Sequence, residues 1–153
     1  MITEASKRII PFRPGDAARV GEGCFYLDQI VWLNGNKIEL GDRVGFNYGC
    51  YVNGYGGLTV GSDTIVGPYT MIHTANHWMD DHARPIHEQG WKARPVEIGP
   101  GCWIGMGVCI LPGVTLGEGC VVGAGSVVTT DLGAFSIAVG NPAQVIRDRR
   151  GGR

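Results

Sequence analysis

The amino-acid sequence predicts an all-β fold, a parallel β-helix of triangular cross-section. Three observations support this prediction. Glycine is abundant, with 26 residues in a chain of 153, more than twice its usual share of about 7%. Large apolar residues recur at an interval of six, whereas a helix repeats near 3.6 residues and a flat strand near two. A glycine follows most of these residues, but it is missing after every third one.

The interval of six indicates a short extended segment followed by a bend, repeated along the chain. A smaller residue lies four positions after most of the large ones, and we expect both positions to face the interior. Three of the smaller positions hold cysteine, which we predict to be buried and unreactive. The large positions are Leu40, Phe46, Val52, Val60, Val66, Ile72, Ile98, Ile104, Ile110, Leu116, Val122 and Val128. The smaller positions are Val44, Cys50, Thr64, Thr70, Cys102, Val108, Val114, Cys120 and Ser126.

The missing glycines predict the number of sides. When the hexads are grouped in threes, the third hexad carries Asn53, His73, Leu111 or Thr129 after its large residue, whereas the first two carry glycine or, once, Asn47. The true period is therefore eighteen residues, which describes a coil with three flat sides and tight turns. Four clear coils and one irregular coil before residue 40 would stack into a prism about 20 to 25 Å tall.

Length and composition indicate a single domain over residues 1–153, with the prism covering residues 22–140. The net charge of -1 offers no general attraction for nucleic acid or anionic lipid. No apolar run approaches the roughly 20 residues that span a bilayer, and the opening MITEASKRIIPFRPGD lacks the apolar core of a signal peptide. We therefore expect a cytoplasmic protein, and five cysteines without a CxxC pair suit that reducing compartment.

A long loop is predicted to leave the prism at residues 73–97. Ile72 and Ile98 are 26 positions apart where the repeat needs six, and all four histidines of the chain lie between them. Insertions of this length are uncommon in compact domains and usually carry function. Because the loop contains several large apolar residues, we expect it to be ordered and docked along the prism, forming a groove. These apolar residues are Trp78, Met79, Ile86 and Trp91.

The end of the chain is predicted to form a short helix over residues 142–150 that covers the last coil. Asn141 is a favourable N-cap, and Pro142 suits the first position of a helix. Such a cap would close an otherwise open sheet edge.

The stretch IGPGCWIGMGVCILPGVTLGEGCVVGAGSVVTTD, residues 98–131, resembles the hexapeptide-repeat acyltransferases. The similarity runs from about residue 38 to 147 and includes the loop position and the terminal GNPAQVIR. The resemblance implies a left-handed β-helix, although parallel crossovers are generally right-handed.

The resemblance also implies an activity. IHTANHW, which ends in His77 and Trp78, resembles the stretch that holds the general base of maltose and galactoside O-acetyltransferases. His77 would then take a proton from a sugar hydroxyl as that hydroxyl attacks the thioester of acetyl-CoA. Imidazole titrates near pH 6.5, so its neutral, accepting form is available in the cytoplasm.

Other residues of the site carry two interpretations each. FNYG resembles a family motif in which the asparagine, here Asn47, helps to position the acceptor and the histidine, but Asn47 also suits a turn that usually holds glycine. We expect His82 and His87 to be solvated. His73 fits either an outward structural residue or a neighbour of the site.

Trp103 in CWIG resembles a tryptophan that lines the acetyl-CoA site of the family. The family often carries lysine where this chain has Thr130 and Gln144, and those lysines would help to bind phosphate. Arg147, Arg149 and Arg150 could substitute, since guanidinium groups form paired bonds to phosphate, but an arginine-rich tail is also often a solvated terminus. The acetyl-CoA residues predicted from the resemblance are Trp103, Gly105, Gly123, Thr129, Asn141, Pro142 and Arg147.

Three alternatives to sugar O-acetylation stay open. The acceptor could be the amine of an amino sugar. A zinc lyase like the gamma carbonic anhydrases shares the fold, but no histidine precedes His73, so the loop alone would have to supply three ligands, and we expect no metal. A prism without catalysis could serve assembly. The resemblance further implies a homotrimer in which His77 and Asn47 meet the cofactor across a subunit boundary.

Overall fold

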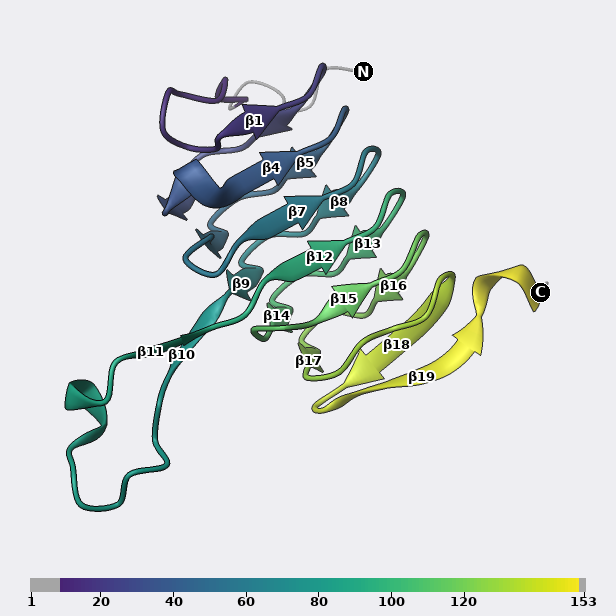
Figure 1. Cartoon of the computed structure of the whole chain (residues 1–153). Coiled ribbons are helices and arrows are strands. Elements are labelled where there is room, and N and C mark those ends of the chain that lie inside the picture. Colours follow the sequence, from purple (N-terminus) through teal and green to yellow (C-terminus); the bar gives the residue numbers. More distant parts are fainter. Residues whose placement is uncertain (1–8, 152–153) are drawn as a thin grey trace.

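The computed structural model describes residues 9–151, and its strands form three parallel sheets that make the three sides of a prism (Figure 1). The ends of the predicted domain, residues 1–8 and 152–153, lie outside the described residues. Followed from the N-terminus, the coils wind in the left-handed sense implied by the resemblance (Figure 1).

Each of the five complete coils gives one strand to each sheet, and the second side is extended by two further strands, the second of them antiparallel. The first side contains β1 (Arg19–Val20), β4 (Ile38–Leu40), β7 (Leu58–Val60), β12 (Val96–Ile98) and β15 (Thr115–Leu116). The second side contains β2 (Phe25–Tyr26), β5 (Gly45–Phe46), β8 (Ile65–Val66), β13 (Trp103–Ile104), β16 (Val121–Val122), β18 (Ser136–Gly140) and β19 (Ala143–Asp148). The third side contains β3 (Val31–Leu33), β6 (Tyr51–Asn53), β9 (Met71–His73), β14 (Cys109–Ile110) and β17 (Val127–Val128).

The interior confirms the hexad pattern. All twelve large positions and all nine smaller positions are buried, each with no more than 2% of its surface exposed. The two threonines among them are satisfied by hydrogen bonds, because the hydroxyl of Thr64 donates to the carbonyl of Gly99 and that of Thr70 to the carbonyl of Gly105. A buried hydroxyl without such a partner would be costly. The prism is therefore filled along its axis by one continuous core.

The coil before residue 40 exists as expected and is formed by β1, β2 and β3. A sixth, incomplete coil was not expected: Leu132 bridges to Leu116 on the first side, and β18 pairs in parallel with β16 on the second. Leu132 and Ala138 are buried in the same core. The hexad spacing is lost after Val128, so the repeat alone could not reveal this coil.

The predicted helix over residues 142–150 is wrong. These residues form β19, which pairs antiparallel with β18 across a turn at Asn141 and Pro142, followed by the short 3-10 turn η4 (Arg149–Gly151). Asn141 and Pro142 fit a hairpin turn as well as a helix start. The structure has the hairpin because β18 would otherwise be the edge strand of the second side, with unpaired backbone N–H and C=O groups. A following strand can bond to these groups, whereas a helix cannot.

The long loop is ordered, but it does not lie along its own prism as predicted. Its two limbs, β10 (Ala75–His77) and β11 (Trp91–Ala93), form an antiparallel hairpin that projects from the middle of the prism, with the 3-10 turn η3 (Ile86–Glu88) near its tip (Figure 1). We call residues 74–95 the arm. Its apolar side chains face solvent in a single chain, with 41 to 60% of the surface exposed at Trp78, Met79, Ile86 and Trp91.

Candidate functional site

The arm is rooted at one corner of the prism by a short hydrogen-bond chain. The hydroxyl of Thr74 donates to the carbonyl of Asn53 and accepts from the amide of Gly56, and the carbonyl of Thr74 accepts from the amide of Arg94. A Cβ on Gly56 would lie 2.2 Å from that carbonyl oxygen, so only glycine fits. The GYGG stretch at residues 54–57 lengthens this hexad to eight residues. Its Gly56 makes the backbone contacts that hold the base of the arm.

This corner, where the third side turns into the first, also carries the residues that replaced glycine in the sequence pattern. Asn53 pairs with His73 in the next coil, so the two side chains lie one above the other. Leu111 and Thr129 continue the same column in the following coils, since β14 pairs with β9 and β17 with β14. We call the column the arm corner.

His77 lies at the end of β10, directly opposite Trp91 of β11. The imidazole stacks on the indole with ring centroids 3.9 Å apart and an interplanar angle of 33°. Its Nδ1 is buried and has no hydrogen-bond partner among the described residues. Stacking thus holds the ring in one orientation, while the other nitrogen stays available for proton transfer.

A cavity of about 310 Å³ opens beside this pair at the arm corner. Trp91 and Tyr55, with rings 5.9 Å apart, form its aromatic wall. Its size is at the lower end of the range for small-molecule sites, and it combines flat aromatic faces with amide and imidazole groups. The cavity is lined by Leu33, Asn34, Tyr51, Asn53, Tyr55, His73, Ala75 and Trp91.

Asn53 was not predicted as a site residue, yet it organises this cavity. Its side-chain carbonyl accepts from the amide of Asn34 at 2.8 Å and from the backbone N–H of Tyr55 at 3.0 Å, and its NH2 group donates to the Tyr51 hydroxyl at 3.4 Å. It is buried, with 8% of its surface exposed. The sequence could have indicated Asn53 as a neighbour of His73, because it occupies the same turn position one coil earlier.

Asn47 lies elsewhere. It follows β5 at the corner where the second side turns into the third, in register with Gly67, Gly105 and Gly123 of later coils. Its side-chain carbonyl accepts from the amide of Tyr48 at 2.7 Å, and the residue is exposed. We call this column the glycine corner. It is one full side, about 15–20 Å, from the arm corner, so a single chain does not bring Asn47 and His77 together.

Most of the predicted acetyl-CoA residues gather at the glycine corner. Trp103 projects from the second side with 58% of its surface exposed, and register continues from Trp103 through Val121 and Ile137 to Arg147 at the edge of the sheet. Asn141 and Pro142 form the hairpin turn beyond Gly140, whose amide donates to Ser126. Thr129 is separate, because it belongs to the arm corner.

At Gly67 and Gly105, the glycine corner brings successive coils close together with no side chains between them. A Cβ on Gly105 would lie 2.6 Å from the backbone nitrogen of Ala124, so the coils are in contact here through backbone alone. This leaves a flat strip beside the exposed face of Trp103. Among the expected arginines, Arg149 donates to the carbonyl of Gly119, and Arg150 is paired with Asp148.

The buried cysteines are not nucleophiles. Burial raises the pKa of Cys50 and of Cys102 to about 11, and it raises that of Cys120 as well. The reactive thiolate is therefore scarce at neutral pH, as the sequence pattern predicted.

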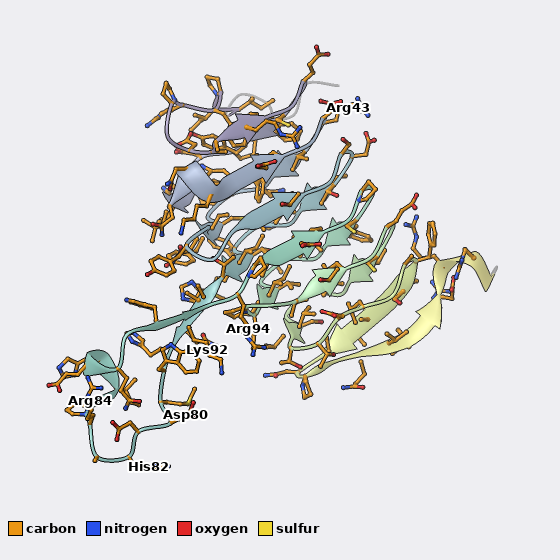
Figure 2. All side chains as sticks on the ribbon, in the orientation of Figure 1. Arg43, Asp80, His82, Arg84, Lys92 and Arg94 are labelled. Atoms are coloured by element: carbon orange, nitrogen blue, oxygen red, sulfur yellow. The ribbon has the colours of Figure 1, made fainter. Side chains whose placement is uncertain are left out.

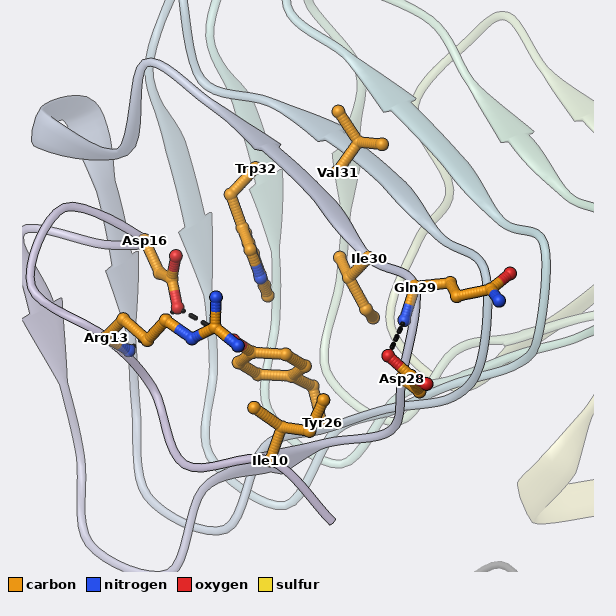
Figure 3. A pocket seen from close by; sticks show the side chains of 9 residues that line it. All are labelled: Ile10, Arg13, Asp16, Tyr26, Asp28, Gln29, Ile30, Val31 and Trp32. Carbon is orange, nitrogen blue, oxygen red and sulfur yellow. Dashed lines mark hydrogen bonds between the residues drawn. The ribbon is translucent and has the colours of Figure 1, made fainter. Parts of the chain in front are cut away.

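A second pocket of about 440 Å³ lies at the N-terminal end of the prism (Figure 3). Part of its polar lining is internally bonded, because the Tyr26 hydroxyl and the Arg13 backbone amide both donate to the Asp16 carboxylate. Phe12, Tyr26 and Trp32 pack edge to face above Phe46 and close the end of the core. The pocket thus belongs to the end cap of the prism.

Within residues 9–151, no group of three or more histidine, cysteine, aspartate or glutamate side chains is arranged to hold a metal ion. In the same range, no helix has the length and apolarity needed to cross a membrane.

The structure described above is a prism of hexapeptide repeats with a histidine on a projecting arm, and comparison with known proteins identifies the family of the repeats. Residues 95–130 match the family model of the bacterial transferase hexapeptide, six repeats. Among curated proteins, nodulation protein L of Rhizobium leguminosarum bv. viciae is 46% identical over 119 residues, which are 78% of this chain and 60% of that protein.

Solved structures agree. A maltose O-acetyltransferase from Clostridium difficile 630 superposes with a TM-score of 0.79 at 34% identity, covering 86% of this chain and 69% of that one. A hexapeptide-repeat acetyltransferase from Vibrio cholerae, solved in complex with acetyl coenzyme A, superposes with a TM-score of 0.77 at 29% identity, covering 86% of this chain and 71% of that one. The chain belongs to the hexapeptide-repeat acyltransferase family. It spans about half the length of the curated relatives that it matches.

Proposed function

We propose that this protein is an acetyl-CoA-dependent O-acetyltransferase that acts on a sugar hydroxyl, with His77 as the general base. The observation that carries the proposal is the position of His77, which is stacked on Trp91 at the edge of an aromatic-walled cavity. Aromatic faces beside polar groups suit a sugar ring, whose C–H faces pack on aromatics while its hydroxyls bond to polar side chains.

Bound acetyl-CoA would supply the acetyl group as a thioester. His77 accepts the proton of the acceptor hydroxyl through the nitrogen that is not buried, as the hydroxyl oxygen bonds to the acetyl carbon. The carbon–sulfur bond of the thioester then breaks, and the protonated His77 returns the proton to the leaving sulfur, which departs as the thiol. Stacking on Trp91 holds the imidazole in place for this transfer, and general-base assistance of this kind typically contributes about 10² to 10⁴ in rate. An amine acceptor would need the same proton transfer, so N-acetylation remains the second candidate.

We further propose that the active site is shared between copies in a homotrimer. In one chain, His77 lies on the arm, which leaves the prism at the arm corner, and Trp103 with the glycine corner lies one side away. An adjoining copy would bring its Trp103 to the arm and cover the exposed apolar residues of the arm. Asn47, at the same corner as Trp103, would then reach the neighbour's His77.

The activity is tested by following thiol release from acetyl-CoA with methyl glucosides, methyl galactosides, maltose and nucleotide-linked sugars, using the wild type and His77→Ala. We expect acceptor-dependent release that falls at least a hundredfold in the variant. His82→Ala is the matched control, because His82 is exposed near the tip of the same arm (Figure 2). Equal rates for the wild type and His77→Ala would disprove the role of His77.

A further inference from the structure

We propose that His73 is a second acceptor-binding residue, which bonds a hydroxyl of the sugar remote from the hydroxyl that is acetylated. This inference rests on the proposed function and specifies its substrate class: a ring sugar with a free hydroxyl at each end. The observations that carry it are the position of His73 in the cavity wall and its missing partner.

His73 faces the same cavity as the aromatic wall but lines a different part of it. His73, Ala75 and His77 alternate along an extended chain, so their side chains point to one side of it. Four extended residues place the Cα atoms of His73 and His77 about 13 Å apart. His73 and Ala75 both line the cavity, and Trp91, on which His77 stacks, lines it as well. An acceptor in the cavity therefore meets two imidazoles at separate points.

The bonding of the neighbours shows that His73 is not needed to hold the corner together. Asn53, directly below it in register, is tied to Asn34, Tyr51 and Tyr55 by hydrogen bonds. His73 has no such role, since its Nδ1 is buried without a hydrogen-bond partner among the described residues. Its ring is 6.0 Å from that of Tyr51, centroid to centroid. The His73 ring thus lines the cavity with a nitrogen that no described residue satisfies, a state that calls for a partner such as a bound group.

The charge state of His73 favours a hydroxyl as that ligand group. Burial lowers the pKa of His73, so the imidazole is neutral at pH 7 and presents one donor and one acceptor. A hydroxyl also donates and accepts, whereas a phosphate or carboxylate offers acceptors alone and would be bound more strongly by the protonated ring. The arm corner is therefore suited to a neutral sugar unit at this point.

The experiment measures kcat and KM for the best acceptor among methyl glucoside, methyl galactoside and methyl N-acetylglucosaminide, and for its monodeoxy derivatives. For His73→Leu, which keeps the bulk of the side chain, we expect KM to rise about three- to tenfold with kcat nearly unchanged, the range of one neutral hydrogen bond. One monodeoxy acceptor should lose about the same factor with the wild type but nothing further with His73→Leu. His73→Asn, which can donate and accept, should recover part of the affinity.

His82→Leu serves as the control and should leave every constant unchanged. A lower kcat without a rise in KM, or the same penalty for each monodeoxy acceptor in the wild type and in His73→Leu, would overturn the inference while leaving the proposed function intact. If the wild type neither binds acetyl-CoA nor releases thiol with any acceptor, the proposed function itself fails, and the role of His73 fails with it.

Discussion

The outer face of the first side differs sharply from the outer faces of the second and third sides. All three sides present the same apolar residues to the interior, but the first side shows solvent a polar column made of Arg19, Glu39, Thr59, Glu97 and Thr115. The second side shows Phe25, Gly45, Ile65, Trp103, Val121 and Ile137. The third side shows Val31, Tyr51, Met71, Cys109 and Val127.

This difference indicates which faces meet other molecules. Contiguous exposed apolar surface on a protein marks a contact region, and several of these residues are widely exposed in one chain, among them Ile65 at 58% and Met71 at 45%. On the first side, by contrast, Arg19 and Glu39 form a solvated ion pair. The inner positions of the hexads therefore encode the prism, whereas the outer positions distinguish one polar face from two apolar faces.

The largest expected effect comes from placing a charge on an apolar outer face. Ile65→Arg and Met71→Arg should each dissociate the trimer if the face concerned is covered, because an arginine there would be buried without a partner. Activity should then fall more than a hundredfold. Sedimentation velocity gives the oligomeric state. Thr59→Arg, in the same coil but on the first side, is the matched control, and its dissociation would contradict the assignment of faces.

A smaller effect separates the two faces of a single strand. Ile110 points inward from β14 and is 1% exposed, whereas its neighbour Cys109 points outward. Ile110→Ala should lower the free energy of unfolding by about 2–5 kcal/mol, because it leaves a cavity in the core. Cys109→Ala should lower the free energy of unfolding by less than about 1 kcal/mol when the chain is monomeric. Urea denaturation of both variants in the Met71→Arg background measures this, and equal losses would refute the distinction.

The smallest expected effect is a pH dependence at the arm corner. Because burial lowers the pKa of His73 in the folded protein, the unfolded chain takes up this proton first as the pH falls. The contribution of His73 to stability is therefore complete above its unfolded pKa of about 6.5 and is lost as the pH falls from there toward the lowered value. The unfolding free energy of His73→Gln should decline less over this range than that of the wild type. Parallel curves would contradict the prediction.

Parts of the candidate site could be predicted from the sequence, and others could not. His77 was predicted because a local motif carries it, and its catalytic role stays a prediction; the histidines of the arm stood out by their clustering. Asn53 was missed, although it shares the turn position of His73, because an asparagine at a turn has an adequate local explanation. The predicted Asn47 matched a short motif, but the register of the coils places it at another corner.

The sequence by itself determined the prism. Its period of eighteen residues, three sides, inward positions and the point where the arm leaves all follow from local requirements, because each hexad must bury two side chains and then turn. The tertiary structure alone decided the path of the arm, the strand that replaced the expected helix after Pro142, and the joining of His73, Asn53 and Trp91 in one cavity. These features depend on which backbone edge or side chain lies in the adjoining coil, and a linear pattern does not contain that neighbour.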